Sequence, residues 1–193
     1  MTVMQLFPVP VYSEQLSLDL PEIEKYSQEL KKRNETARRS NRGGWQSEPL
    51  VGKHPPLNDL RDAIYKHGEE YRKTIGYKSP FEIKGMWVNV NGYKDYNVEH
   101  THPHCIVSGC FFIKVSRPEF AHGLLELLHP SIHLMNRDWA GDDLFEFSQF
   151  NNPQLSISPV PNQLIFFPSW LVHSVSQNLS KKDDRISISF NLG

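Results

Sequence analysis

The sequence has few cysteines, no long apolar run and no excess of charge of either sign. Its 193 residues include only two cysteines, Cys105 and Cys110. They lie five positions apart on one predicted strand, and side chains alternate between the two faces of a strand. The two thiols are therefore expected to point in opposite directions, without a disulfide between them. Scarce, unpaired cysteine favours a cytoplasmic protein, or one of the host cytoplasm if the source is viral.

The charge balance and the hydropathy exclude two classes of partner. Twenty-one basic residues face 22 acidic ones, for a formal net charge of −1, whereas a nucleic-acid binder needs an excess of Lys and Arg. The longest apolar run, "LIFFPSWLV" (164–172), is too short to span a bilayer. The first residues, "MTVMQLFPVPVY", lack a basic region followed by an apolar core, so no secretory signal is expected. We expect no nucleic-acid partner and no membrane association.

The pattern of the chain changes after Gly76. Before it, the segment 6–12 reads as an extended edge piece, 21–39 and about 56–71 as helices, and 40–56 as a loop. After it come short β-rich segments separated by Gly, Pro, Asn and Asp: 81–93, 105–115, 123–128, 154–160, 163–175 and 185–192. This pattern predicts a mainly β protein with N-terminal helices, of the α+β class, built as a sandwich or barrel. We expect one domain over 1–193, with 1–76 as helical cover and edge strand and 77–193 as the β core.

Chemically active residue types gather in the stretch "HTHPHCIVSGC" (100–110). On a strand, His100 and His102 would point to the same face, while Pro103 bends the chain before His104. A third histidine, His173, lies on a distant predicted strand. Two nearby ligands and one distant ligand form a facial triad, which leaves one side of a first-row metal open. The alternative is a polar turn that happens to contain histidines.

The strand after His173 carries Arg185 and Ser187, two residues apart and therefore on one face. A guanidinium beside a hydroxyl suits the far carboxylate of a dicarboxylic acid, because the guanidinium fork binds a carboxylate through two hydrogen bonds. The alternative is a surface arginine that pairs with Asp183 or Asp184.

The order His-x-His, distant His, Arg-x-Ser resembles the double-stranded β-helix oxygenases that use Fe(II) and 2-oxoglutarate. More narrowly, the chain resembles an uncharacterised 2OG-Fe(II) oxygenase family of marine bacteria and their phages. The segments that carry the resemblance are "LFPVPVY" (6–12), "GGWQS" (43–47), "HTHPHCIVSG" (100–109), "FPSWLVHSV" (167–175) and "DRISISFN" (184–191). The resemblance implies a jelly-roll (cupin-like) core over 77–193.

The same resemblance implies an oxidoreductase, a 2-oxoglutarate-dependent non-heme iron dioxygenase. It would hydroxylate a C–H bond of an unidentified substrate, either a protein side chain such as proline or a small molecule, and decarboxylate 2-oxoglutarate to succinate. His100, His102 and His173 would hold the iron, with His102 in the middle position. Arg185 and Ser187 would bind the 2-oxoglutarate carboxylate. From its place on the strand before the histidines, Asn89 is expected either to contact this cosubstrate or to lie on a polar, solvated face. Dioxygen is the other partner, and a homodimer is left open.

One position departs from the broader superfamily, which usually has Asp or Glu where His102 stands. Three neutral imidazoles would leave the full charge of the metal until an anion binds. Two alternatives follow. One is a three-histidine dioxygenase that binds its substrate directly, without 2-oxoglutarate. The other is a non-enzymatic jelly-roll module with structural zinc, which would need a fourth ligand such as His104 or Cys105.

Overall fold

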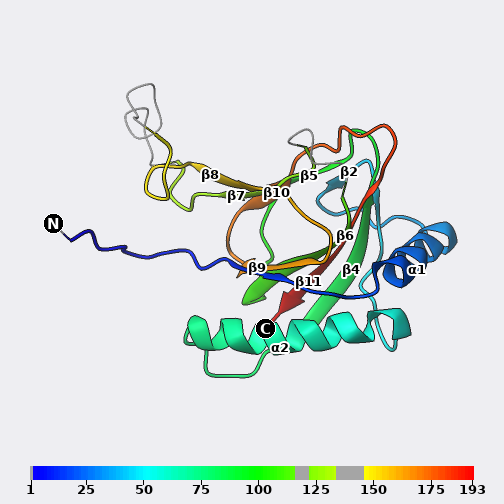
Figure 1. Cartoon of the computed structure of the whole chain (residues 1–193), viewed down its shortest axis with the longest axis horizontal. Helices are drawn as coiled ribbons and strands as arrows, with labels where there is room; N and C mark the ends of the chain where they lie inside the picture. Colours follow the sequence, from blue (N-terminus) through cyan, green and yellow to red (C-terminus); the bar gives the residue numbers. More distant parts are fainter. Residues whose placement is uncertain (1, 116–121, 134–145) are drawn as a thin grey trace.

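The fold consists of two antiparallel sheets that pack face to face, with helices on the outer side of the larger sheet (Figure 1). This computed structural model describes residues 2–115, 122–133 and 146–193. The mainly β class with N-terminal helices is confirmed, and the two-sheet arrangement is that of a jelly roll. No helix in these ranges is both long and apolar enough to cross a membrane.

The larger sheet has six strands and the smaller has five. In spatial order, the larger sheet contains β1 (Tyr12–Gln15), β9 (Gln163–Pro168), β6 (Val107–Lys114), β11 (Arg185–Leu192), β4 (Ile83–Asn91) and β3 (Trp45–Gln46). The smaller sheet contains β2 (Asn41–Arg42), β5 (Tyr96–His100), β10 (His173–Val175), β7 (Leu125–Leu128) and β8 (Gln154–Ile157). Three strands from the first 76 residues, β1, β2 and β3, therefore take part in the sheets.

The helices are α1 (Leu20–Arg33), the 3-10 turn η1 (Pro55–Leu57) and α2 (Asn58–Thr74). The Asp19 side chain caps α1 by accepting a hydrogen bond from the backbone N–H of Glu22. The sequence-based end of this helix, at residue 39, is wrong. The chain turns extended at Asn34, and Ala37 then donates its backbone N–H to Gln46 at 2.8 Å. Pairing with the segment at β3 replaces the last turns of the expected helix.

Strand β11 explains how one sheet serves both a core and a cavity. Its sequence, "RISISFNL", alternates strictly between apolar and polar residues. Ile186, Ile188 and Phe190 are fully buried in the cluster that also contains apolar residues of both helices. The intervening residues, including Arg185 and Ser187, face the space between the two sheets. The part of the inner face that β11 provides is therefore polar, whereas Phe112 and Phe167 of β6 and β9 give the same face an apolar part. Buried polar groups are costly unless they have partners, so this strand is a candidate for ligand binding.

Other differences from the sequence-based elements occur where short strands depend on their partners. The segment 163–175 does not form one strand, because a turn closed by Leu171 N–H to the Pro168 carbonyl (3.0 Å) carries the chain from β9 to β10. Strand β5 was not predicted, and β2 and β3 lie in the predicted loop 40–56. Cys105 lies just before β6 rather than within the strand, and both cysteines are free.

Candidate active site

Two neighbouring strands of the smaller sheet and the loop after one of them carry the three histidines. His100 is the last residue of β5 and His173 the first of β10, and the two are direct partners across the antiparallel pair. His102 lies beyond the end of β5, so strand alternation does not position it. Instead, its backbone N–H donates to the Ser169 carbonyl at 3.0 Å, which ties its loop to the turn before β10.

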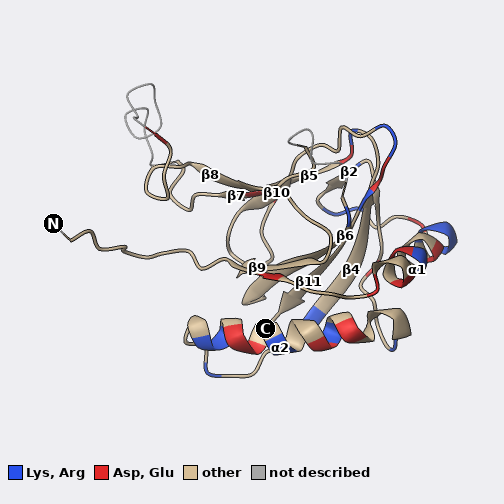
Figure 2. Ribbon diagram, viewed as in Figure 1, with Lys and Arg blue, Asp and Glu red and all other residues tan. Residues whose placement is uncertain are grey.

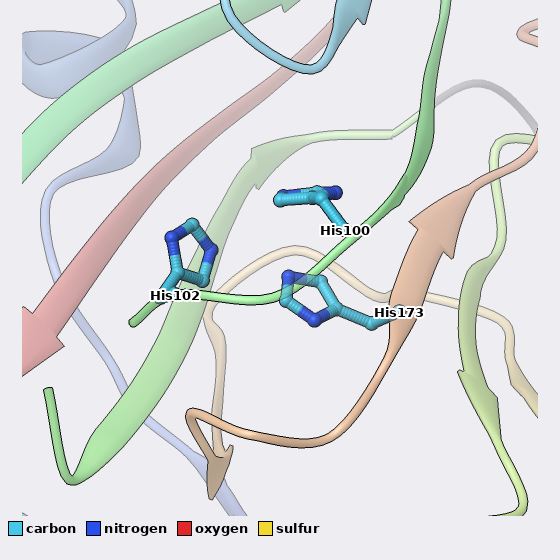
Figure 3. Close-up of side chains that lie close together, drawn as sticks. All are labelled: His100, His102 and His173. Carbon is cyan, nitrogen blue, oxygen red and sulfur yellow. The ribbon is translucent and has the colours of Figure 1, made fainter. Parts of the chain in front are cut away.

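The three side chains converge (Figure 3). One ligand-capable nitrogen from each ring lies within 4.8 Å of the other two. The ring centroids are 4.3 Å apart for His100 and His173, 5.0 Å for His100 and His102, and 5.1 Å for His102 and His173. Within the described ranges, neither His104 nor Cys105 belongs to the group, so the fourth protein ligand of a closed zinc site is missing there.

Backbone carbonyls fix the tautomer of two of these rings. Nδ1 of His100 lies 2.7 Å from the Val98 carbonyl, and Nδ1 of His173 lies 2.8 Å from the Leu171 carbonyl. Because a carbonyl can only accept a hydrogen bond, each Nδ1 carries the proton. The lone pair of each Nε2 is therefore available to a metal ion, in the arrangement typical of metal-binding histidines.

The surroundings also keep the rings uncharged. Burial lowers the pKa of His100, and burial together with repulsion from His100 lowers the pKa of His102 to about 4. The pKa of His173 falls to about 3, chiefly through burial. All three imidazoles are consequently neutral near pH 7, which is the form that binds metal.

Arg185 is buried at the start of β11, with 3% of its surface exposed. Its Nη1 donates a long hydrogen bond of 3.5 Å to Asn91 Oδ1, and its Nε has no partner among the described residues. The surface interpretation of Arg185 is wrong, because this side chain is buried, and the nearby Asp184 pairs with Lys31 at 3.6 Å. Burial lowers the Arg185 pKa to about 10, so the group is still a cation at neutral pH. A buried cation without an anion is costly, and no described residue supplies an anion to Arg185, which makes it a candidate anion-binding group.

The histidines and the arginine line one cavity of about 500 Å³ between the sheets. Ser187 and Asn89 line it too, so every residue proposed from the sequence reaches the same space. Asn89 donates from Nδ2 to Ser189 Oγ at 3.0 Å. Three neutral nitrogen donors fit an iron ion, and a buried guanidinium whose Nε has no partner among the described residues fits a carboxylate. The donor set therefore suits Fe(II) and 2-oxoglutarate.

Several cavity residues were not singled out from the sequence. Ser189 and Asn191 follow Arg185 and Ser187 on the same face of β11, so the alternation of "RISISFN" could have identified them. Gln46 also lines the cavity, but it lies in a two-residue strand that no local pattern announces.

Comparison with known proteins adds the family. The model of the family described as "Putative 2OG-Fe(II) oxygenase" matches residues 85–191, more than half of the chain. No curated protein matches the chain in sequence.

Solved structures share the fold at low sequence identity. A prolyl-4-hydroxylase of Pseudomonas putida is 13% identical with a TM-score of 0.62, over 94% of this chain and 91% of that one. The epimerase SnoN from nogalamycin biosynthesis is 13% identical with a TM-score of 0.68, over 95% and 77%. HygX from Streptomyces hygroscopicus, solved with nickel and 2-oxoglutarate, is 11% identical with a TM-score of 0.64, over 96% and 83%.

At such identities the structural likeness establishes the fold, and the family match establishes the class of enzyme. The matched region contains every residue of the three-histidine cluster as well as Arg185 and Ser187. The chain belongs to the 2OG-Fe(II) oxygenase family, and it is an oxidoreductase that depends on Fe(II) and 2-oxoglutarate.

Proposed function

We propose that His100, His102 and His173 hold Fe(II), and that Arg185 and Ser187 hold the distal carboxylate of 2-oxoglutarate. One observation carries this proposal. Three neutral imidazoles and a buried guanidinium with an unpaired Nε line the same cavity. The imidazoles thus offer electron pairs to a metal ion, and the guanidinium offers hydrogen-bond donors to a carboxylate. A dicarboxylate that chelates a metal at one end and leaves a carboxylate at the other requires both.

Each residue has a separate task. Bound Fe(II) supplies the activation of dioxygen, coupled to oxidative decarboxylation of 2-oxoglutarate to succinate. Arg185 grips the far carboxylate and Ser187 donates a further hydrogen bond to it, which sets the direction of the cosubstrate. Asn89 lies beside Ser187 on the adjacent strand and contacts the cosubstrate chain.

Aromatic side chains support the ligands. Phe167 packs edge-on against His173 at 4.7 Å between ring centroids, and Trp87 lies 5.6 Å from His102. These contacts hold the imidazoles in place and limit the water around them.

The reaction proposed is hydroxylation of a C–H bond in a protein side chain, such as that of proline, or in a small molecule. A cavity of about 500 Å³ lies within the usual range of about 300–1,000 Å³ for pockets that take small molecules. Among the structural neighbours, one is a prolyl-4-hydroxylase and another was solved with hygromycin B. Both classes of substrate are compatible with the volume.

Anaerobic titration with Fe(II) and 2-oxoglutarate tests the assignment of residues. A weak visible charge-transfer band should appear only when both are present, and Arg185→Ala should abolish it at cosubstrate concentrations that saturate the natural protein. Arg39→Ala is the matched control, because Arg39 lines the same cavity but is an exposed residue paired with Glu48. Oxygen consumption that does not require 2-oxoglutarate would instead support a three-histidine dioxygenase.

The substrate class is tested by mass spectrometry. Proline-containing peptides and small molecules are incubated with the protein, Fe(II), 2-oxoglutarate and air. The expected product gains one oxygen atom and appears together with an equal amount of succinate. If the rate of succinate formation is the same with a candidate as without it, that candidate is rejected as a substrate.

A further inference from the structure

The first described residues form an apolar arm that extends away from the rest of the protein. Residues 2–9, here called the arm, run outward ahead of β1 with no strand partner among the described residues (Figure 1), and only Val9, at the base, packs against the core. Phe7 is 94% exposed, and Val3, Met4 and Leu6 are each at least 68% exposed. The arm carries no charge (Figure 2). Large contiguous exposed apolar patches are rare on monomers, and they typically mark interaction sites.

A second, smaller cavity opens at the base of the arm. Its volume is about 230 Å³, and its wall includes Pro10, Tyr71, Cys105, Pro168 and Trp170. The Tyr71 hydroxyl donates to the Pro10 carbonyl at 2.8 Å, which fixes the place where the arm leaves. We call this cavity the rear pocket. Pockets that take small molecules usually measure about 300–1,000 Å³, so the rear pocket suits one or two side chains better.

The arm cannot easily fill the rear pocket of its own chain. A β-turn over residues 7–10 would need a backbone N–H at Pro10, which proline lacks. A turn over residues 6–9 would place Pro8 in its third position, where proline is disfavoured because it forces the preceding residue out of the helical region. Neither of these two turns can therefore return the arm to the pocket that begins at Pro10.

We propose that the rear pocket receives the arm of a second copy of this chain, with Phe7 as the side chain that enters it. Pro10 belongs both to the wall of the pocket and to the base of the arm. A twofold axis beside Pro10 therefore brings each arm to the pocket of the other copy, and the same contact forms twice. Eight extended residues reach about 26 Å, which is enough to cross between neighbouring molecules.

Binding of the second copy's arm in the rear pocket would also affect the active site. Cys105, in the pocket wall, follows His102 closely, and its carbonyl accepts a hydrogen bond from the Ser169 hydroxyl. Ser169 is the residue that holds the backbone of His102. An arm in the rear pocket packs against the loop that carries this histidine. Because eight residues are fewer than the 20–30 a side of a typical stable interface, the dimer should dissociate on dilution.

Disulfide trapping tests the placement. In the Phe7→Cys variant the introduced thiol should pair with the natural Cys105 of the second copy, since a disulfide requires the two Cα atoms to lie within about 7 Å. We expect a covalent dimer on a non-reducing gel and a linked peptide pair joining positions 7 and 105. The dimer should disappear when Cys105→Ala is added.

Light scattering over a concentration series gives an independent measurement. Phe7→Ser should lower the dimer fraction at least several-fold, while Val51→Ser, which removes an apolar side chain that is 85% exposed elsewhere, should not. A 7–105 disulfide within one monomer would overturn the proposal in favour of the protein's own arm. A monomer at every concentration, with no 7–105 link, would overturn it altogether. Neither measurement depends on iron, 2-oxoglutarate or turnover, although the link to the active site rests on the proposed function.

Discussion

At the scale of single residues, burial keeps the histidines neutral and so able to bind metal, but it makes the folded state less stable at low pH. The pKa values of His102 and His173 lie near 4 and 3, below the ordinary value of 6.5. Between about pH 6.5 and 4 the unfolded chain therefore binds more protons than the folded one, and stability falls as the pH falls through this window. The midpoint of thermal unfolding of metal-free protein should drop between pH 7 and 5. His173→Gln should show a shallower drop, whereas the exposed His133→Gln should follow the natural protein.

The buried Arg185 likewise lowers the stability of the free protein, and its guanidinium is available to bind an anion. Its unpaired buried Nε costs the free protein about 1–3 kcal/mol, so Arg185→Met should stabilise it by an amount of that order. The same change should eliminate the rise in melting temperature that 2-oxoglutarate produces in the natural protein when Mn(II) is present. A variant that is less stable than the natural protein would show that the guanidinium contributes to the fold itself.

At the scale of elements, β6 must approach its two neighbours, β9 and β11, closely at Gly109. A Cβ added at Gly109 in β6 would lie 2.5 Å from the Ile165 carbonyl oxygen and closer still to the Phe190 ring. Neither neighbour can move freely, because both belong to the packed sheet. Gly109→Ala should therefore destabilise the protein by about 1–3 kcal/mol in urea unfolding. Gly85→Ala on β4, whose Cβ would meet its nearest neighbour at 3.8 Å, is the control and should cost less.

The length and pairing of the strands also determine how much of the site can be predicted from the sequence. The strict alternation of "RISISFN" was enough to put Arg185 and Ser187 on one face, because β11 is long and paired on both sides. The structure brings His100 and His102 together, but not by the strand geometry that the sequence predicts, since β5 ends at His100. Gln46 could not be found, because β3 exists only through pairing with β4. Local patterns identify long strands, while short strands are created by their neighbours.

At the scale of the whole molecule, a metal ion should act on folding as well as on chemistry. The three histidines come from segments separated by more than 70 positions of the chain, and the unfolded protein does not hold them together. An ion that binds only the folded state stabilises it by about 2.7 kcal/mol at 100 times its dissociation constant. Mn(II) should raise the melting temperature and a chelator should reverse the rise. His102→Ala should abolish the effect; His104→Asn, which keeps a residue tolerant of the positive φ there, should not.

The position of the two ligand sets in the sheets has a consequence for motion. Both strands have neighbours on both sides, but Arg185 and Ser187 belong to an eight-residue strand, whereas His173 begins a three-residue strand whose register with β5 is interrupted before Val175. Amide protons of β11 should therefore exchange with deuterium far more slowly than those around β10. The residues proposed to bind the anion, Arg185 and Ser187, would therefore hold a fixed position. The histidines proposed to bind the metal would adjust their position when the ion binds.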